Sequence, residues 1–557
     1  MIARCISSNM KVFVIGLDGA TFDLIQPLIA QGFLPNLKNL MARGAWSELT
    51  STVPPVTASA WNSFMTGKNP GGHGLFDFMQ RRKNSYDLTP ISSHDRDGKT
   101  VWDLAGEAGK QSVVMGVPIT YPPTPLQGVM VTGMLTPRGA PDYTYPAELK
   151  NEIAQNVGEY VVYSDEVYAK GRGEIFLNAL QYSIQQRAKT ARYLLQKYPW
   201  DLGILVFPET DTVCHGLWWA YDATHHQHRQ ENAEKFKHGI REIYQAIDAR
   251  IGELVAALPA DTTIIVMSDH GHGPLRNFLY VNNFLKQRGY LKIKNTLASQ
   301  LKNLAFDAGL TPRAVYGMLL NLGLGKLRRT MDKRRAGRGM LKRFFLSLND
   351  VDWANTRAYS VGYIGEVHIN LKGREPQGII EPGAAYETLR DELIRDLRAM
   401  QLPDGSPLVE HIWKKEEIYS GAHVWDAPDI LFLPKNLETI AFGDFEFGSN
   451  KILEPSYGVS SSHRMNGILI AAGSQIRAKP RIAPTPNLTD LAPTILHALN
   501  LPVPPDMNGH VLNEIFAETR AVEYGGSAAA ERADGEGYSP DEQAEVIERL
   551  KDLGYIS

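Results

Sequence analysis

Short apolar runs and longer helical patterns alternate along the chain, which predicts an α/β fold. The run from Val12 to Leu17 is continuous and rich in β-branched residues, as expected for a strand buried on both faces. Further strands are expected at 113–117, 129–131, 202–207, 263–267 and 468–472. Between them, apolar residues recur at helical spacing over 177–195 and 236–254. The pattern therefore predicts a mostly parallel sheet covered by helices.

Several of these strands are followed by polar turns that contain Asp or His. Asp18 follows the first strand, ETDTVCHG (209–216) follows the strand at 202–207, and SDHGHG (268–273) follows the strand at 263–267. Ligands of open parallel sheets bind beyond the carboxyl ends of the strands. We therefore expect these turns to meet at one edge of the sheet.

Side chains in these turns could hold divalent metal ions. Asp211 and His215 are four residues apart and lie on one face if their turn is helical. Asp269 and His270 are adjacent at a bend, and His463 lies in a Ser-rich loop before a core strand. Each feature alone has an ordinary explanation, such as a helix cap, an Asp turn or a surface histidine. The whole set provides six ligands, enough for two ions: Asp18, Asp211, His215, Asp269, His270 and His463.

A hydroxyl group follows two rigid residues. Pro54 and Pro55 precede Thr57, so this side chain is expected on a stiff loop. A hydroxyl close to a metal ion can act as a nucleophile, because the cation lowers its pKa. Thr57 is therefore a candidate nucleophile, with Ser59 as the nearby alternative.

Composition narrows the class of protein. A chain of 557 residues predicts one large domain with insertions, or about two to three domains. A net charge of -3 gives no general attraction to nucleic acid or acidic membranes. The two cysteines cannot form a disulfide framework, and no apolar run is long enough to span a membrane. We therefore expect a cytoplasmic protein that does not bind nucleic acid.

Changes in residue composition and in the hydrophobic pattern divide the chain into five segments. They are a disordered leader (1–10), the first part of a catalytic core (11–290), an inserted lid or cap (291–425), the second part of the core (426–515), and a linker with a C-terminal amphipathic helix (516–557). Within the insertion, 326–343 carries nine basic residues and one acid. A solvated insertion is the simplest interpretation. A basic lid that contacts an anionic substrate or a membrane surface is the alternative.

The ordered set of motifs resembles the alkaline phosphatase superfamily, and most of all its type I phosphodiesterase/nucleotide pyrophosphatase branch. The resemblance rests on GLDGA (16–20), PPVTASAW…TGKNPGGHG (54–74), ETDTVCHG (209–216), SDHGHG (268–273) and SSSHRMNG (460–467). The closing stretch at 487–509 is also similar. The resemblance implies an alkaline phosphatase-like three-layer sandwich with a mostly parallel central sheet.

The same resemblance implies roles for the candidate residues. One ion would be held by Asp211, His215 and His463, and the other by Asp18, Asp269 and His270. Thr57 would contact the metals and act as the nucleophile. The family usually carries zinc, and this ligand set suits Zn²⁺ or Mn²⁺. His272 or Ser268 would orient a metal-bound imidazole.

The expected reaction is hydrolysis of a small-molecule phosphate ester, either a phosphodiester or a nucleotide pyrophosphate bond, through a phospho-threonine. Family diesterases carry Asn and His shortly after the nucleophile, and a further Asn that helps to hold the phosphoryl oxygen. This chain has Ala60 and Trp61 instead, and the further position falls near Phe78. Nearby substitutes for the oxygen-binding group are Asn62, Asn69 and His73.

Other functions stay open from the sequence. One is a phosphomutase, phosphotransferase or phosphomonoesterase on the same scaffold. Another is a non-catalytic, metal-stabilised scaffold whose basic insertion binds anionic lipid or polymer. No Cys or Ser lies in a C/S-x-P-x-R setting, which argues against a sulfatase. We expect His225, His226 and His228 to form an exposed helical run without a functional role.

Overall fold

The structure is a computed structural model of the chain. It describes residues 10–82, 84–164, 166–228, 232–312, 314, 344–443, 447–478, 481–530 and 537–553. Residues 1–9 of the expected leader and the basic segment 326–343 lie outside this part, so the expectations for them stay predictions. Among the described helices, none has both the length and the apolar content needed to cross a bilayer.

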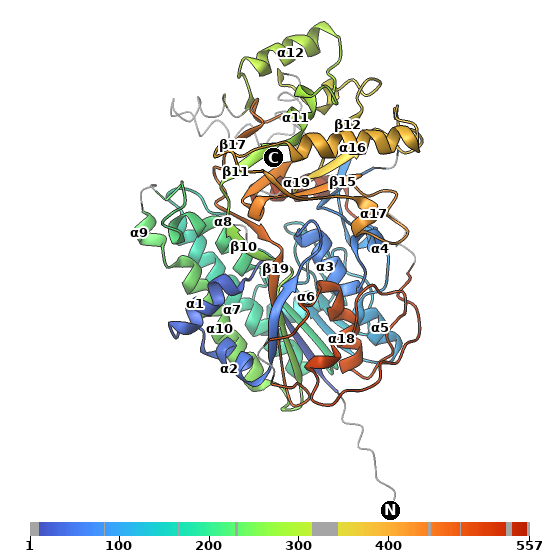
Figure 1. Cartoon of the computed structure of the whole chain (residues 1–557). Coiled ribbons are helices and arrows are strands. Elements are labelled where there is room, and N and C mark those ends of the chain that lie inside the picture. The colour runs from blue at the N-terminus through green and yellow to red at the C-terminus, as the bar shows by residue number, and fades with distance from the viewer. Residues whose placement is uncertain are drawn as a thin grey trace, which may run out of the picture.

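An eight-stranded sheet forms the centre of the larger part of the molecule (Figure 1). Its order is β2 (Ala45–Thr50), β19 (Asn466–Ala472), β9 (Thr263–Met267), β1 (Val12–Leu17), β8 (Leu202–Phe207), β5 (Ser112–Met115), β6 (Gly128–Val131) and β7 (Thr144–Tyr145). The pairs from β9 through β6 are parallel, whereas β19 runs antiparallel to both of its neighbours. The expected mostly parallel sheet is confirmed.

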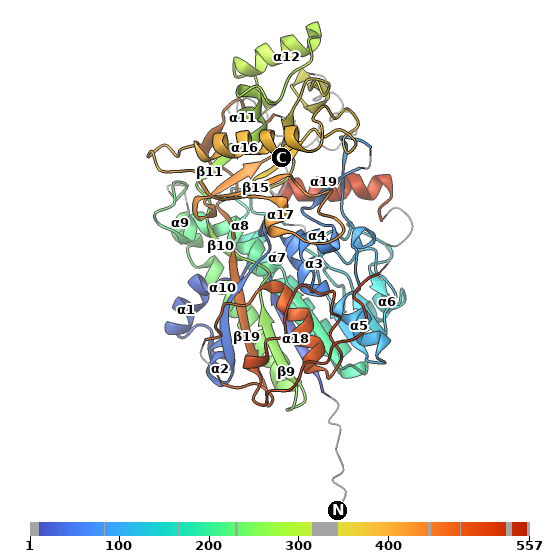
Figure 2. The same ribbon diagram turned by 45° about the vertical axis from the view of Figure 1, so that its right-hand side comes forward.

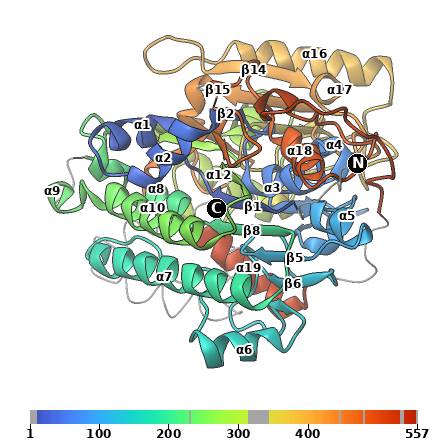
Figure 3. The ribbon, with the colours of Figure 1, turned by 90° about the horizontal axis from the view of Figure 1, so that it is seen from below.

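Helices cover both faces of this sheet, which makes three layers (Figure 3). In β1, Phe13, Ile15 and Leu17 belong to one apolar cluster, and Val12 and Val14 to the other. The first cluster packs against α1 (Phe22–Ala30), α2 (Pro35–Arg43), α7 (Gly173–Lys197), α8 (Glu209–Tyr221) and α10 (Gly239–Ala257). The second packs against α3 (Thr57–Thr66), α5 (Val101–Glu107) and α18 (Leu491–Ala498). Because both faces are buried, the strand sequence is apolar throughout.

A smaller region, called the cap, lies above the carboxyl edge of the sheet (Figure 1). Its two sheets have the orders β16-β11-β17 and β12-β13-β15-β14. Their strands are β11 (Asn277–Tyr280), β12 (Ala358–Tyr359), β13 (Glu366–Ile369), β14 (Val409–Lys414), β15 (Ile430–Pro434), β16 (Thr439–Phe442) and β17 (Leu453–Pro455). Its helices are α11 (Val281–Gln287), α12 (Leu297–Asp307), α16 (Ala384–Arg398) and α17 (Lys415–Ile418). The strands of the cap thus extend beyond the predicted insertion (291–425) on both sides. The division of the chain into domains stays a prediction.

The C-terminal helix α19 (Pro540–Leu553) lies at the junction of core and cap (Figure 2). Val546 and Leu550 are buried in a cluster that also contains Val56, Ala58 and Tyr363. Val56 and Ala58 flank Thr57, whereas Tyr363 comes from the cap. This cluster therefore ties the loop of the candidate nucleophile to the cap and to the end of the chain.

Candidate functional site

Three neighbouring strands bring the predicted turns together. β1 pairs in parallel register with β8 and β9, with Gly16 opposite Val206 and Met267. Asp18, the start of α8 and Asp269 therefore leave the sheet at the same edge. The antiparallel pair of β10 (Gly271–Pro274) and β18 (Ser461–Arg464) then adds His463 to this edge.

Asp211 lies at the centre of a group of three imidazoles. Its Oδ1 is 3.3 Å from Nε2 of His215, 2.6 Å from Nε2 of His272 and 3.6 Å from Nε2 of His463. The Nε2 atoms of His215 and His463 are 3.2 Å apart. One ligand atom from each of the four residues lies within 4.8 Å of the others. The structure therefore adds His272 to the predicted trio of Asp211, His215 and His463.

The second predicted trio lies next to this group. Nε2 of His270 is 3.6 Å from Asp18 Oδ1 and 3.2 Å from Asp269 Oδ2. Asp18, Asp211 and His270 form another set of ligand atoms within 4.8 Å of one another. The rings of His270 and His463 stack with centroids 3.7 Å apart. All six predicted ligands are thus brought together, with Asp211 between the two groups.

Backbone carbonyl groups fix the orientation of these rings. Pro55 O lies 2.8 Å from Nδ1 of His463, Ser461 O lies 3.2 Å from Nδ1 of His215, and Gly271 O lies 3.1 Å from Nδ1 of His270. If Nδ1 carries the hydrogen and donates it, each Nε2 is left as a lone-pair donor facing the carboxylates.

The electrostatics of the cluster favour a bound cation. Burial, together with the charges of Asp269 and Asp211, raises the pKa of Asp18, and burial raises the pKa of Asp269 to about 8. Burial lowers the pKa of His270 to about 3, so this ring is neutral at neutral pH. Burial opposes ionisation of Asp211, but His215 and His272 hold its pKa well below the ordinary value. A divalent cation would offset the repulsion between these close carboxylates and would bind the lone pairs of the neutral imidazoles.

Atoms without partners give an independent test of this interpretation. Asp18 Oδ1 and Asp269 Oδ2 are buried and accept no hydrogen bond from the described residues. Leaving such oxygens buried and unpaired costs free energy, whereas coordination of a cation would satisfy them. Mixed imidazole and carboxylate donors suit zinc or manganese. The cluster therefore has the chemistry needed to hold metal.

Thr57 is the first residue of α3 and is completely buried. Its Oγ1 is 3.1 Å from Nε2 of His270. Val56, at the N-cap, provides no side-chain acceptor for the free N–H groups of the first turn. The hydroxyl is thus placed beside the ligand cluster and at the positive end of a ten-residue helix.

Trp61 explains one departure from the family pattern. Its Nε1 donates to Asp18 Oδ2 at 3.1 Å, and its ring is completely buried on β1. A Cβ at Gly16 would lie 2.4 Å from Cη2 of Trp61, so the indole packs directly on the glycine. Sequence reasoning missed this role, because only the packing of α3 across β1 reveals it.

The substitutes suggested for the phosphoryl-binding group are engaged elsewhere. Asn62 Nδ2 donates to Ala58 O at 2.7 Å, and Asn69 caps α4 (Pro70–His73) by accepting from Gly71 N. His73 Nε2 is 3.0 Å from Ser63 Oγ, and its Nδ1 accepts from Leu75 N at 3.2 Å. Each of the three side chains therefore makes hydrogen bonds within the protein, and no hydrogen bond from them to Thr57 is present among the described residues.

Two further expectations need correction or refinement. Ser268 Oγ donates to His270 O at 2.5 Å and so braces the backbone rather than an imidazole.

The segment that contains His225 is a series of turns, not a helix. His225 is buried, with Nε2 2.7 Å from Leu275 O, and only His226 of the three is fully on the surface. The expected exposed helical run was wrong, because these contacts come from residues distant in sequence.

One family model covers most of the chain. The family model for type I phosphodiesterase / nucleotide pyrophosphatase matches residues 12–441. The comparison with curated proteins gave no match.

Solved structures with a similar fold include human ectonucleotide pyrophosphatase / phosphodiesterase 5, with TM-score 0.50 and 13% identity, covering 91% of this chain and 100% of that one. The murine protein of that name gives TM-score 0.50, 14% identity and the same coverage. Phosphonoacetate hydrolase from Sinorhizobium meliloti 1021 gives TM-score 0.48 and 13% identity, over 88% of this chain and 95% of that one. At these identities the two ectonucleotide pyrophosphatase / phosphodiesterase structures support the fold alone, and the match of the family model supports the chemistry. The chain belongs to the type I phosphodiesterase/nucleotide pyrophosphatase family and is a metal-dependent hydrolase of phosphate esters.

Proposed function

We propose that the enzyme hydrolyses a phosphodiester or pyrophosphate-type bond through a phospho-threonine at Thr57. The observation that carries this proposal is the position of Thr57 Oγ1, 3.1 Å from Nε2 of His270 and at the N-terminus of α3. A hydroxyl group is too basic to attack phosphorus unaided at neutral pH. Thr57 therefore needs nearby positive charge, which metal ions held by the ligand cluster would supply.

Different residues would hold the metal ions and attack the phosphorus atom. We assign one ion to Asp211, His215 and His463, and the other to Asp18, Asp269 and His270. When bound, divalent ions supply positive charge that lowers the pKa of a nearby hydroxyl and stabilises charge on phosphoryl oxygens. Thr57 provides the attacking oxygen. His270, whose Nε2 lies 3.1 Å from Thr57 Oγ1, is neutral and would therefore hold a metal ion next to this hydroxyl.

The first turn of α3 supplies the anion-binding groups that the side chains do not. The first N–H groups of a helix have no partner within the helix, and Val56 provides no side-chain cap for them, so they are available to a phosphoryl group bound at Thr57. They can donate to a phosphoryl oxygen without Asn62, Asn69 or His73. This assignment accounts for the absence of the family Asn near Phe78.

Zinc is the proposed metal, with manganese as the second choice for the same donor set. A diester or pyrophosphate is preferred to a monoester because that is the chemistry of the matched family. The cytoplasmic location, which rests on the low cysteine content, stays a prediction.

The test compares the rates on 4-nitrophenyl phosphate and bis(4-nitrophenyl) phosphate at defined zinc or manganese concentration. We expect faster turnover of the diester, and loss of turnover in Thr57→Ala with metal content retained. A phosphate-release assay with and without glycerol separates hydrolysis from transfer to an acceptor. Preferred hydrolysis of the monoester, or undiminished diester turnover by Thr57→Ala, would contradict the proposal.

A further inference from the structure

A polar cavity adjoins the candidate active site on the cap side of Tyr363. The ring centroids of Tyr363 and His463 are 5.9 Å apart. Tyr363 N donates to Asp77 Oδ2 at 2.8 Å, and Asp77 lines the cavity together with Val361 and Gly362. Tyr363 therefore connects the wall of the cavity with the ligand cluster.

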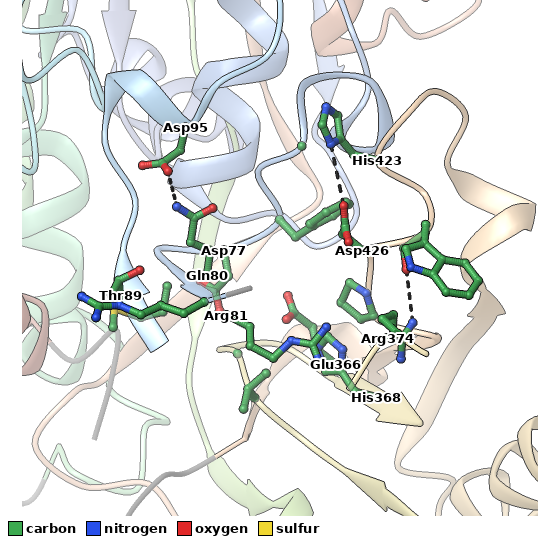
Figure 4. A pocket seen from close by; sticks show the side chains of 18 of the residues that line it. Asp77, Gln80, Arg81, Thr89, Asp95, Glu366, His368, Arg374, His423 and Asp426 are labelled. Carbon is green, nitrogen blue, oxygen red and sulfur yellow. Dashed lines mark hydrogen bonds and ion pairs between the residues drawn. The ribbon is translucent and has the colours of Figure 1, made fainter. Parts of the chain in front are cut away.

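The cavity has a volume of about 810 Å³, within the range of small-molecule sites. Its walls come from residues 74–95 of the core, from β13, and from cap loops at 373–374 and 423–428 (Figure 4). It is therefore formed jointly by core and cap and is large enough for one substituent of a phosphodiester.

Glu366 and His368 bring unpaired polar atoms to this cavity. They are two residues apart on β13, so their side chains lie on the same face of the strand. They are only 3% and 7% exposed, yet Glu366 Oε1 and both ring nitrogens of His368 have no hydrogen-bond partner in the part of the chain that the structure describes. Buried groups of this kind are normally satisfied. A ligand in the cavity would supply the missing partners.

Two guanidinium groups of the wall, in contrast, are already paired with carboxylates within the protein. Arg81 Nη1 lies 2.5 Å from Glu375 Oε1, and Arg374 makes two hydrogen bonds to Asp429, at 2.5 and 2.8 Å. These two guanidinium groups are therefore not available to an anionic group in the buried part of the cavity, whereas Arg82, an exposed residue of the wall, donates to Gln543 Oε1 at 3.3 Å. Burial, with the nearby charge of Asp77, raises the pKa of Glu366, which favours the neutral carboxyl and disfavours a bound cation. The cavity suits a neutral ligand.

A protonated carboxyl and a neutral imidazole each donate one hydrogen bond and accept others, as hydroxyl groups do. At the rim, Trp425 is 52% exposed and offers an apolar ring face. We propose that this cavity binds a neutral, hydroxyl-rich group, a sugar or polyol, carried as one ester substituent of the phosphodiester substrate. This inference rests on the proposed function, because it names the substrate class of the same site.

The test uses 4-nitrophenyl phosphodiesters that share one leaving group and differ in the second substituent: glucosyl, thymidine 5′-yl, choline or methyl. We expect kcat/KM for the glucosyl ester to exceed that for the methyl ester about tenfold or more, because the sugar hydroxyl groups can form hydrogen bonds with Glu366 and His368 on β13. Glu366→Leu and His368→Leu, which remove the hydrogen-bonding groups, should each reduce this ratio, mainly through KM. The matched control is Glu381→Leu, whose side chain is 62% exposed on the cap surface and should leave the ratio unchanged.

Preference for the thymidine or choline ester, or a ratio that neither cavity variant changes, would overturn the inference. Failure of the wild-type enzyme to hydrolyse any of the four esters would instead refute the proposed function. For that case, calorimetric titration of glucose 1-phosphate into Thr57→Ala protein tests the cavity without turnover. Binding that Glu366→Leu weakens supports the inference, and absence of binding, or binding that this replacement leaves unchanged, refutes it.

Discussion

The replacement Trp61→Phe tests whether the indole N–H supports the metal site. Phe retains most of the ring that packs on Gly16 but removes the hydrogen bond from Nε1 to Asp18 Oδ2, which is 3.1 Å long. A hydrogen bond to a charged group contributes about 1.5–3 kcal/mol. If it acts mainly on ionised Asp18, metal affinity should fall about ten- to hundredfold, the range typical for groups that orient metal ligands.

Competition with a chromogenic chelator measures this affinity directly. Trp102→Phe is the matched control, because Trp102 is equally buried and its Nε1 makes no hydrogen bond within the described chain. Both variants should lose some stability through packing, but only Trp61→Phe should lose metal affinity. If Trp61→Phe binds zinc as tightly as Trp102→Phe does, the indole N–H of Trp61 does not support metal binding.

Three further predictions concern metal content, packing and pH. Asp269→Ala should lower bound metal and activity together, and elemental analysis showing a full complement of metal would contradict the ligand assignment. Gly16→Ala should destabilise the protein by about 1–3 kcal/mol in urea unfolding, because the new Cβ would lie 2.4 Å from Trp61 and 3.0 Å from Val206; an unchanged midpoint would argue against this packing. Burial raises the pKa of Asp77 from 3.8 to about 7, so the folded state keeps a proton that the unfolded state loses, and stability should fall as pH rises across this interval. The free energy of unfolding of wild-type protein, measured relative to Asp77→Asn, should show this decline, and a parallel pH dependence of the two proteins would refute it.

Much of the site could be predicted from sequence because parallel strands share one carboxyl edge. The apolar run at Val12–Leu17 identified a buried strand, and the turns after neighbouring strands had to meet there. Asp211 and His215 needed only helical spacing to be placed together. Local patterns were therefore enough for the six candidate ligands.

Other features depend on contacts between distant segments. His272 reaches Asp211 because β10 pairs with β18, and Trp61 reaches Asp18 because α3 crosses β1. His225 is buried by its contact with Leu275, fifty residues away. No local periodicity encodes these pairings, so sequence reasoning left His272 in a supporting role and placed His225 on the surface.

The cavity beside Tyr363 could not be predicted for a related reason. Its polar groups come from a core segment and from strand β13 of the cap, nearly three hundred residues apart, as the hydrogen bond between Asp77 and Tyr363 shows. The alternation of residues in β13 predicts that Glu366 and His368 share a face, but not what lies opposite that face.

The central claim is that Thr57 carries the phosphoryl group during turnover. The most direct measurement is acid quenching of the metal-loaded enzyme during hydrolysis of a phosphodiester, followed by mass spectrometry of the peptide that contains Thr57. We expect a phosphorylated Thr57 in wild-type protein during turnover, and neither phosphopeptide nor turnover in Thr57→Ala. Sustained turnover by Thr57→Ala, or a phosphoryl group found on a different residue, would contradict it.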